Sequence, residues 1–264
     1  MRLFALALAC ASVSLPTVAA EEPREEPVET PILVPSPIPV GVLIAWKPMI
    51  LSVRADTGQG SQFGSDKLQP LRILGRYTTT LFHEKLLARA ELEGGQFQTD
   101  TQGKNIGTEG YDVTARLLGG TATRISPLLT ITASAGLITR YQRGRAIGGA
   151  PSVGVFGGTS NVEFEFRVAP AVTASFYVEG GLVPIPYGTE AGLGVLSDAS
   201  ELRSRVQLSF DLTATTAIDV GYDFTRWHAS FAGASAFSAD GQNNHALLLE
   251  DREHALTIGF RWKP

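Results

Sequence analysis

Cysteine is nearly absent from this chain: Cys10 is the only one among 264 residues. A protein with so little cysteine cannot rely on disulfides or thiol chemistry, so its stability must come from the fold itself. Long apolar runs are also absent. No stretch reaches the roughly 18 apolar residues that mark a transmembrane helix, which excludes a helical membrane protein.

The chain also lacks a strong net charge. The formal net charge is −4, and residues 21–39, with five glutamates and one arginine, account for it. The rest of the chain is close to neutral and has no basic footprint for nucleic acid. No cluster of histidine, cysteine and aspartate has the spacing of a metal site. The sequence therefore predicts no metal, no cofactor and no nucleic-acid partner.

The first twenty residues have the layout of a secretory signal peptide. Arg2 supplies a positive charge, a short apolar stretch runs to Ala9, and small residues at positions 18–20 offer a cleavage site before Glu21. We therefore predict that residues 1–20 are a signal peptide and that the protein is exported through the periplasm.

Residues 21–39 are predicted to be a periplasmic linker. They contain six prolines, so this segment cannot form a strand ladder and should be extended and solvated. The linker acts as a tether, or it contacts the cell wall or a periplasmic partner. The alternative to cleavage after Ala20 is lipid attachment at Cys10, because Ala7-Leu8-Ala9-Cys10 loosely resembles a lipobox.

A two-residue alternation dominates the C-terminal part of the chain. Mostly apolar residues occupy the even positions from Leu202 to Leu212, from Ile218 to Phe224 and from Leu256 to Trp262. The odd positions between them are mostly polar or charged. A two-residue period places each set on its own face of a sheet, so one face is apolar and the other carries full charges.

The same pattern extends back to about residue 42 and predicts ten strands. Short turns near residues 82–85, 126–127, 169–170 and 215–217 alternate with longer polar loops. The predicted loops are 56–69, 98–110, 142–152, 184–200 and 232–253. The predicted strands are 42–55, 70–82, 86–97, 111–125, 128–141, 153–168, 171–183, 201–214, 217–231 and 254–263.

Short turns at one end and long loops at the other are typical of an outer-membrane barrel. Most of the strands also reach the roughly 9–11 residues that cross a bilayer at a tilt. A soluble β-sandwich is the alternative, because alternation alone does not separate the two folds. Export, strand length and loop asymmetry favour the membrane. The predicted fold is all-β, an antiparallel transmembrane up-and-down β-barrel of about ten strands over residues 40–264.

From residue 42 onward the chain resembles the small outer-membrane β-barrel proteins of Gram-negative bacteria. The resemblance rests on the turn-and-loop pattern and on the last alternating strand, His254 to Trp262. Such proteins usually end on an aromatic residue that the barrel-assembly machinery reads, whereas Lys263 and Pro264 follow here. The resemblance is to an architecture and not to a functional family. It implies an outer-membrane location, with the assembly machinery, outer-membrane lipid and lipopolysaccharide as partners.

In such a barrel the apolar face meets lipid and the charged face lines the lumen. Alternate residues along 129–137, 162–168 and 172–178 are predicted to face outward. The charges predicted to line the lumen are Arg72, Arg76, Arg89, Glu91, Arg116, Glu163, Glu165, Arg167, Glu179, Arg203, Arg205 and Asp211, with Glu93 and Asp112 on the same face.

A barrel of about ten strands is barely wider than the eight-stranded size that side chains fill. Its inward charges must therefore pair with one another or be hydrated. We expect Glu163 and Glu165 to pair across the lumen with Arg203 and Arg205. A paired lumen would be plugged, and a hydrated one would be a narrow pore.

Two loop arginines, Arg143 and Arg145, are candidates for the rim of the barrel. There they could contact lipopolysaccharide phosphates, or they could simply be solvated. Ser238 to Asn244 is polar but lacks the acidic spacing of a calcium loop, so it is expected to be a plain loop tip.

The enzyme candidate is the pair His228 and Ser230. A His-x-Ser pair on a barrel strand resembles the catalytic pair of outer-membrane lipid A deacylases, in which the histidine would activate the serine. That family has an asparagine after the serine, where this chain has Phe231. The acidic candidates Glu250 and Asp251 are predicted to lie in a loop. The alternative is that His228 belongs to the girdle of residues that lies at the membrane interface, near the lipid headgroups, and has no catalytic role.

Outer-membrane aspartyl proteases are a second enzyme class with ten strands. They need paired acids and an Asp/His pair at the rim, but this sequence has no Asp-x-Asp or Asp-x-His. The sequence therefore predicts a non-enzymatic barrel. It is a structural barrel or a narrow pore for passive transport, with a charged lumen and long extracellular loops. A surface-binding, adhesin-like barrel is the alternative.

Overall fold

The computed structural model describes residues 40–56, 61–69, 72–82, 86–101, 104–144, 152–187, 189, 193–232 and 247–263. These residues belong to one compact unit, 33–264. The predicted signal peptide and linker, Cys10, Arg145 and the segment 238–244 lie outside the described residues. Among those described, no helix is long and apolar enough to span a bilayer.

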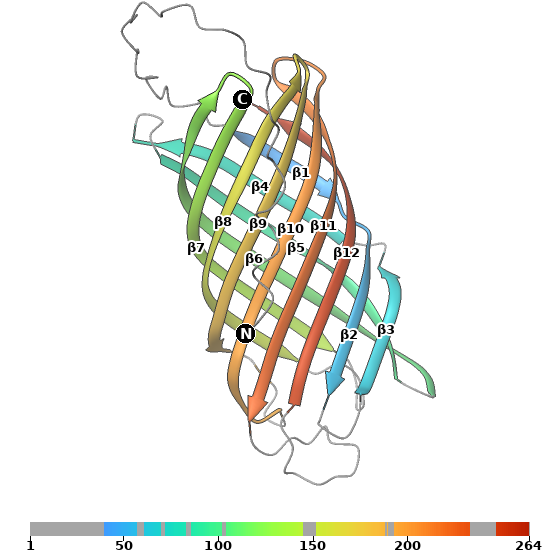
Figure 1. Ribbon diagram of the computed structural model, residues 1–264. Coiled ribbons are helices and arrows are strands. Elements are labelled where there is room, and N and C mark those ends of the chain that lie inside the picture. Colours follow the sequence, from blue (N-terminus) through green and yellow to red (C-terminus); the bar gives the residue numbers. More distant parts are fainter. Residues whose placement is uncertain are drawn as a thin grey trace, which may run out of the picture. The chain divides into compact units, whose positions relative to one another are not determined.

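The chain forms one antiparallel sheet that closes on itself (Figure 1). Its elements are β1 (Gly41–Trp46), β2 (Met49–Asp56), β3 (Ser61–Gln69), β4 (Arg72–Leu81), β5 (Leu86–Thr101), β6 (Lys104–Ser126), β7 (Leu129–Gly144), β8 (Val153–Ala169), β9 (Val172–Pro186), β10 (Val195–Asp211), β11 (Thr216–Ala232) and β12 (Leu247–Trp262).

These elements make ten barrel strands, as predicted. β1 and β2 are two parts of one strand, because both pair with β12, on either side of Lys47 and Pro48. Pro48 has no N–H to donate to the ladder, which accounts for the break. β3 and β4 form the second strand, and both pair with β5.

The strands are staggered as they go round the barrel. A row of cross-strand partners that starts at Gly41 on β1 and passes through every strand returns to the first strand at Val53 on β2, a stagger of 12 residues. Ten strands with this stagger tilt by about 40° from the barrel axis. That is the tilt of membrane barrels. In Figure 1 the strands of the near and far walls slant in opposite directions.

The two ends of the barrel differ. Short turns follow β6, β8 and β10 at the end where β1 begins and β12 finishes. At the other end, β7, β9 and β11 are joined to their successors by longer connections. We call these the short-turn end and the long-loop end. This asymmetry is the one that the sequence predicted.

Most predicted long loops are shorter in the structure, because the strands continue into them. β3 occupies most of the predicted loop 56–69, and β5 and β6 extend through most of 98–110. β12 begins at Leu247, so Glu250 and Asp251 lie on a strand and not in a loop. Composition predicted loops there, but ladder hydrogen bonds form between backbones and need no apolar side chains.

The faces have the polarity of a membrane barrel. On β10 the outward side chains of Leu202, Val206 and Leu208 are 49%, 54% and 42% exposed, whereas the inward Arg203 and Arg205 are buried. Outward apolar residues are likewise found along β7, β8 and β9, as predicted. A soluble sandwich would bury the apolar face, so this inverted arrangement confirms the membrane barrel.

Candidate functional site

The lumen holds a connected network of buried ion pairs. Arg203 lies at its centre, with its guanidinium nitrogens 3.1 Å from Glu91, 3.4 Å from Glu93 and 3.3 Å from Asp223. Arg205 also donates to Asp223, at 2.8 Å. These five residues come from β5, β10 and β11, so the network joins opposite walls of the barrel.

From Glu93 the network extends toward β1 and β4. The Lys47 ammonium is 2.7 Å from Glu93, and Arg72 donates to the same carboxylate at 2.8 Å. Arg72 also donates to Asp112 on β6 at 2.5 Å. Lys47 follows β1 directly, and its own backbone N–H bonds the carbonyl of Arg72, so this lysine is held in the lumen by main chain and side chain.

Arg140 and Arg116 extend the network to the remaining walls. Arg140 donates to Asp251 at 3.0 Å and to Glu253 at 2.8 Å. Arg116 donates to Glu179 at 3.0 Å and is also paired with Glu201. Glu253 also lies 3.9 Å from Arg72, which joins these pairs to the central network. With Arg76, which donates to Glu91, the connected set comprises seven basic and eight acidic side chains among the described residues. Its charge is therefore nearly balanced.

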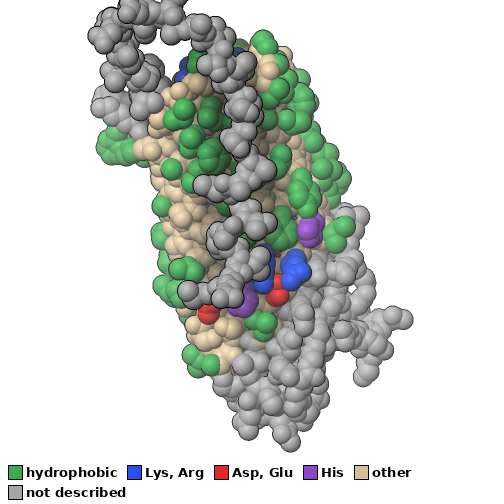
Figure 2. All heavy atoms as spheres, viewed as in Figure 1, with side chains coloured by type: hydrophobic (Ala, Val, Ile, Leu, Met, Phe, Trp, Pro, Cys, Tyr) green, Lys and Arg blue, Asp and Glu red, His purple; other side chains and the backbone are tan. Residues whose placement is uncertain are grey.

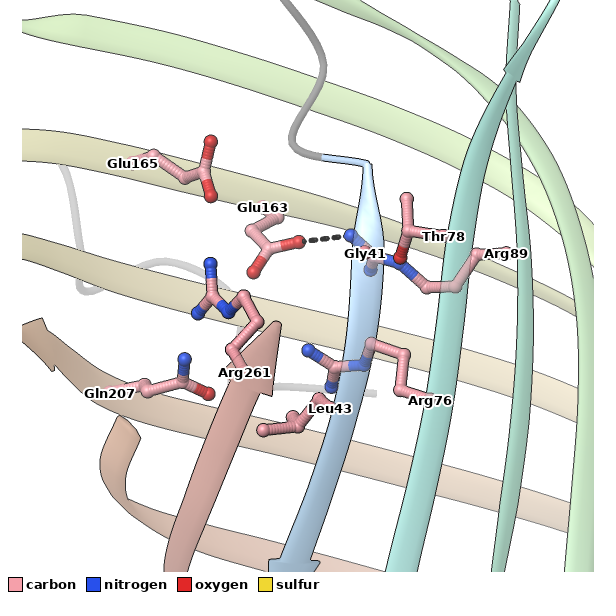
Figure 3. A pocket seen from close by; sticks show the side chains of 9 residues that line it. All are labelled: Gly41, Leu43, Arg76, Thr78, Arg89, Glu163, Glu165, Gln207 and Arg261. Atoms are coloured by element: carbon pink, nitrogen blue, oxygen red, sulfur yellow. Dashed lines mark hydrogen bonds and ion pairs between the residues drawn. The ribbon is translucent and has the colours of Figure 1, made fainter. Parts of the chain in front are cut away.

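A separate pair stands nearer the short-turn end. Arg89 donates to Glu163 at 2.8 Å, across the barrel from β5 to β8. Figure 3 shows these side chains with Glu165 and Arg261 around a small cavity. The cavity has a volume of about 30 Å³, which is room for little more than a water molecule.

The lumen at the long-loop end is apolar. Trp227, Ala229 and Phe231 on β11 point inward and pack with Val155 on β8 and Leu249 on β12. The Arg140 guanidinium lies 5.2 Å from the Trp227 ring centroid, where the ion-pair network meets this apolar cluster. The described lumen is thus filled by an apolar cluster at the long-loop end and by ion pairs in its middle, and it widens to a hollow of about 270 Å³ at the short-turn rim.

Most of the predicted lumen charges lie where the alternation placed them. Arg72, Arg76, Arg89, Glu91, Arg116, Glu163, Glu179, Arg203 and Arg205 are buried inside the barrel, and so are Glu93 and Asp112. Glu165 is half-buried beside the small cavity. The last two, Arg167 and Asp211, lie at the short-turn mouth of the lumen, where they border a hollow of about 270 Å³. Arg167 is exposed and bonds the Pro170 carbonyl in a turn, and Asp211 is half-buried at the short-turn rim, paired with Lys263.

The predicted pairing partners are wrong. Glu163 pairs with Arg89, while Arg203 and Arg205 pair with acids on β5 and β11. The stagger of the strands sets which inward residues meet across the lumen, and alternation within a strand carries no information about it.

Several lumen charges were missed at the sequence level: Lys47, Arg140, Glu201, Asp219, Asp223, Asp251 and Glu253. Arg140 has the same parity as the inward residues of its strand and could have been found from it. Asp251 and Glu253 were assigned to a loop. Nothing in the alternation of β1 singles out Lys47, because the proline that follows it interrupts the strand.

The outer wall is not uniformly apolar. Past Phe224 on β11 and Leu256 on β12, toward the long-loop end, the outward residues include Arg226, His228 and Arg252. Figure 2 shows basic, acidic and histidine side chains gathered toward that end of this face, among hydrophobic side chains and the tan atoms of other side chains and the backbone. Both arginines donate through Nε to Glu250, at 2.8 and 2.9 Å.

His228 and Ser230 lie on this outer wall, on the same face as Tyr222, as parity predicted. The Ser230 hydroxyl is 2.9 Å from that of Ser197, and the His228 ring is 4.0 Å from the Asp198 carboxylate. Glu250 is the cross-strand partner of His228.

The two arginines that hold Glu250 compete with any role in orienting this histidine. Among the described contacts, no hydrogen bond joins His228 to Ser230, and the Asp198 carboxylate is 4.0 Å from the histidine ring. At the rim, Arg143 is exposed at the end of β7, opposite Tyr111. No group of three or more metal-ligating side chains gathers within the described part of the chain.

No protein-family model matches the chain, and no curated protein does. Among solved structures it is similar to the outer membrane protease OmpT from Escherichia coli, at 10% identity and a TM-score of 0.47, covering 88% of this chain and 99% of that one. It is also similar to the Pseudomonas putida toluene transporter TodX, at 7% identity and a TM-score of 0.36, covering 87% and 91%.

A third similar structure is a Pseudomonas aeruginosa FadL homologue, at 4% identity and a TM-score of 0.35, covering 85% of this chain and 90% of that one. Likenesses at this level carry no argument about what this chain does. The chain has the architecture of an outer-membrane β-barrel, as its own closed sheet and inverted polarity show.

Proposed function

We propose that this protein is a closed outer-membrane barrel, a structural scaffold that holds its long-loop end at the cell surface and does not conduct solutes. The observation that carries the proposal is the filled lumen. Buried ion pairs occupy its middle and an apolar cluster lies at the long-loop end. Open space is found only toward the short-turn end of the described lumen, as a cavity of about 30 Å³ and a hollow of about 270 Å³ at the rim.

The energetics support a plug over a hydrated pore. A charged side chain buried without a partner costs several kcal/mol, and removing one member of a buried pair typically costs about 3–5 kcal/mol. Arg203 touches three carboxylates, so moving its side chain out of the lumen would leave all three less well paired. A pore that opened by such a movement would be rarely populated.

The apolar cluster supports the same conclusion. Trp227 and Phe231 are almost fully buried inside the barrel at the long-loop end. A hydrophobic constriction excludes water and ions even when the gap between its side chains is wide enough to admit them. A solute entering from this end would meet the apolar cluster first and the ion-pair network next.

A liposome-swelling assay tests this proposal. The purified protein is refolded into liposomes, and the swelling rate is followed in isosmotic solutions of small sugars and amino acids. We expect a rate equal to that of protein-free liposomes, while a general porin in parallel gives rapid swelling. Swelling that falls with solute size would contradict the proposal and support the passive-transport alternative.

A binding role at the surface is compatible with a closed barrel and would depend on the loops. We propose no catalytic role for His228 and Ser230. Two acids lie on the strands beside this pair: the Asp198 carboxylate is 4.0 Å from the His228 ring, beyond hydrogen-bond distance, and Glu250 is held by Arg226 and Arg252.

A further inference from the structure

The outer wall carries a row of small side chains that crosses five strands. Ala88 on β5 is the cross-strand partner of Gly119 on β6, and the row continues through Ala135, Ser160 and Gly180 on β7, β8 and β9. The wall is hollowed along this row, forming a groove of about 800 Å³. Four strand spacings give it a length of about 19 Å.

Larger side chains flank this row on both sides. On the long-loop side, Leu117, Leu137 and Leu182 are 60%, 49% and 67% exposed. On the short-turn side, Leu86 and Val162 project from the wall. The groove is therefore a band of missing side-chain volume between two ridges, on the face that meets lipid.

The glycines in this row are not required by the fold. A Cβ atom on Gly180 would meet nothing within 4 Å, and one on Gly119 would meet only the Leu87 carbonyl, at 3.9 Å. Neither glycine has a positive φ. Gly136 differs, because its Cβ would lie 2.0 Å from the Leu117 carbonyl oxygen. The volume left free by Gly119 and Gly180 thus lies outside the barrel.

The groove continues toward charged residues. At Gly180 it meets a second hollow of about 600 Å³, bordered by Leu202, Arg226 and His228 and, at its edge, by the exposed carboxylate of Asp198. Cross-strand rows climb toward the long-loop end from β4 to β12, because the row that starts at Gly41 returns at Val53. The end of the groove at Arg226 therefore lies nearer the long-loop end of the barrel. The other end, at Ala88, lies deeper in the membrane.

Arg226 and Arg252 are placed to bind an anion at the end of the groove that lies nearer the long-loop end. Glu250 receives a hydrogen bond from the Nε of each, which fixes the two guanidinium groups side by side. Their side chains are 50% and 55% exposed, so the terminal nitrogens can reach a ligand on the outside. Arginine pairs suit phosphate because the planar group donates two parallel hydrogen bonds.

We propose that this groove binds one lipid A molecule of lipopolysaccharide, with a phosphate on Arg226 and Arg252 and an acyl chain along the Gly180–Ala88 row. The occupant is argued from the arrangement. A site for an anionic headgroup, near the long-loop end, is continuous with an apolar groove that runs deeper into the membrane. The long-loop end faces the outer leaflet in such barrels, and lipid A forms that leaflet.

Native mass spectrometry of the refolded protein in detergent, titrated with lipid A, tests the proposal. Arg226→Gln together with Arg252→Gln should weaken binding by about tenfold or more for each arginine lost, since each charged hydrogen bond contributes roughly 1.5–3 kcal/mol. Gly119→Leu with Gly180→Leu should also weaken binding by about tenfold, by filling the groove.

Matched controls separate the site from general effects. Arg167→Gln removes an exposed arginine at the short-turn end, and Gly75→Leu adds a side chain to an outward glycine whose Cβ would meet only the Leu92 carbonyl, at 3.9 Å. Both should bind lipid A like the unmodified protein. Heat-dependent electrophoretic mobility confirms that each variant forms a barrel.

Titrations of the unmodified protein with other lipids show which kind of phosphate the site binds. Dephosphorylated lipid A should bind the unmodified protein as weakly as intact lipid A binds the double arginine variant. Phosphatidylglycerol, whose phosphodiester carries a single charge, should bind at least about tenfold more weakly than lipid A. Equal affinity for phosphatidylglycerol would overturn the assignment to lipid A. Unchanged binding by either double variant would overturn the proposed site.

Discussion

The isolated pair Arg89 and Glu163 allows a sharp test of the lumen. Its donor and acceptor are 2.8 Å apart, and the two side chains are 5% and 7% exposed. Removing one partner leaves the other charge buried, which costs about 3–5 kcal/mol, whereas replacing both is often close to neutral. We therefore expect Arg89→Met and Glu163→Gln each to destabilise the barrel by about 3–5 kcal/mol.

The double variant should be much less destabilised than the sum of the two single variants. We expect a coupling energy of at least about 2 kcal/mol, measured by urea unfolding of the barrel in phospholipid vesicles with tryptophan fluorescence as the signal. Arg140→Ala is the control, because Arg140 pairs with Asp251 and Glu253 toward the long-loop end and should be additive with Glu163→Gln. Additive losses for Arg89 and Glu163 would show that this pair does not form.

Three further predictions test the faces and the packing. Leu208→Arg on the lipid face should cost about 2–4 kcal/mol, whereas Leu212→Arg, on the same face at the short-turn end, should cost about 0–1 kcal/mol; equal losses in urea would mean that the membrane depth is misassigned. Trp227→Ala should cost about 3–5 kcal/mol in the same assay by emptying the apolar cluster, and a loss below 1 kcal/mol would refute its tight packing. Gly136→Ala should cost about 1–3 kcal/mol by crowding its neighbour, while Gly75→Ala should be tolerated, and similar unfolding midpoints would contradict this.

The sequence predicted the fold well because alternation is a local property. Each strand of the barrel carries its own inside and outside, so the inward position of Arg203 and the outward position of Leu208 follow from their neighbours in the chain. The ten strands and the two unlike ends follow from the same pattern with the turns between.

The interior of the barrel was less predictable because it depends on stagger. Glu163 meets Arg89 across the lumen since the sheet is offset by 12 residues on closing. No single strand encodes that offset. The apolar cluster was missed for a related reason: Trp227 has inward parity, but its apolar partners lie on other strands that only the closed barrel brings together.

The outer-wall site was unpredictable for a different reason. Loop composition placed Glu250 outside the barrel wall, although it lies on β12 between two arginines. The groove consists of missing volume, and small residues such as Ala88 and Gly180 show no pattern until the register aligns them.

The most direct test of the closed barrel is single-channel recording in a planar lipid bilayer. The purified unmodified protein should insert without producing stable current steps in potassium chloride at moderate voltage. A variant that empties the lumen, Arg203→Ala with Arg205→Ala and Trp227→Ala, should produce steps that prefer cations, because Glu91, Glu93 and Asp223 would then line an open path. Large, steady current steps from the unmodified protein would contradict the account.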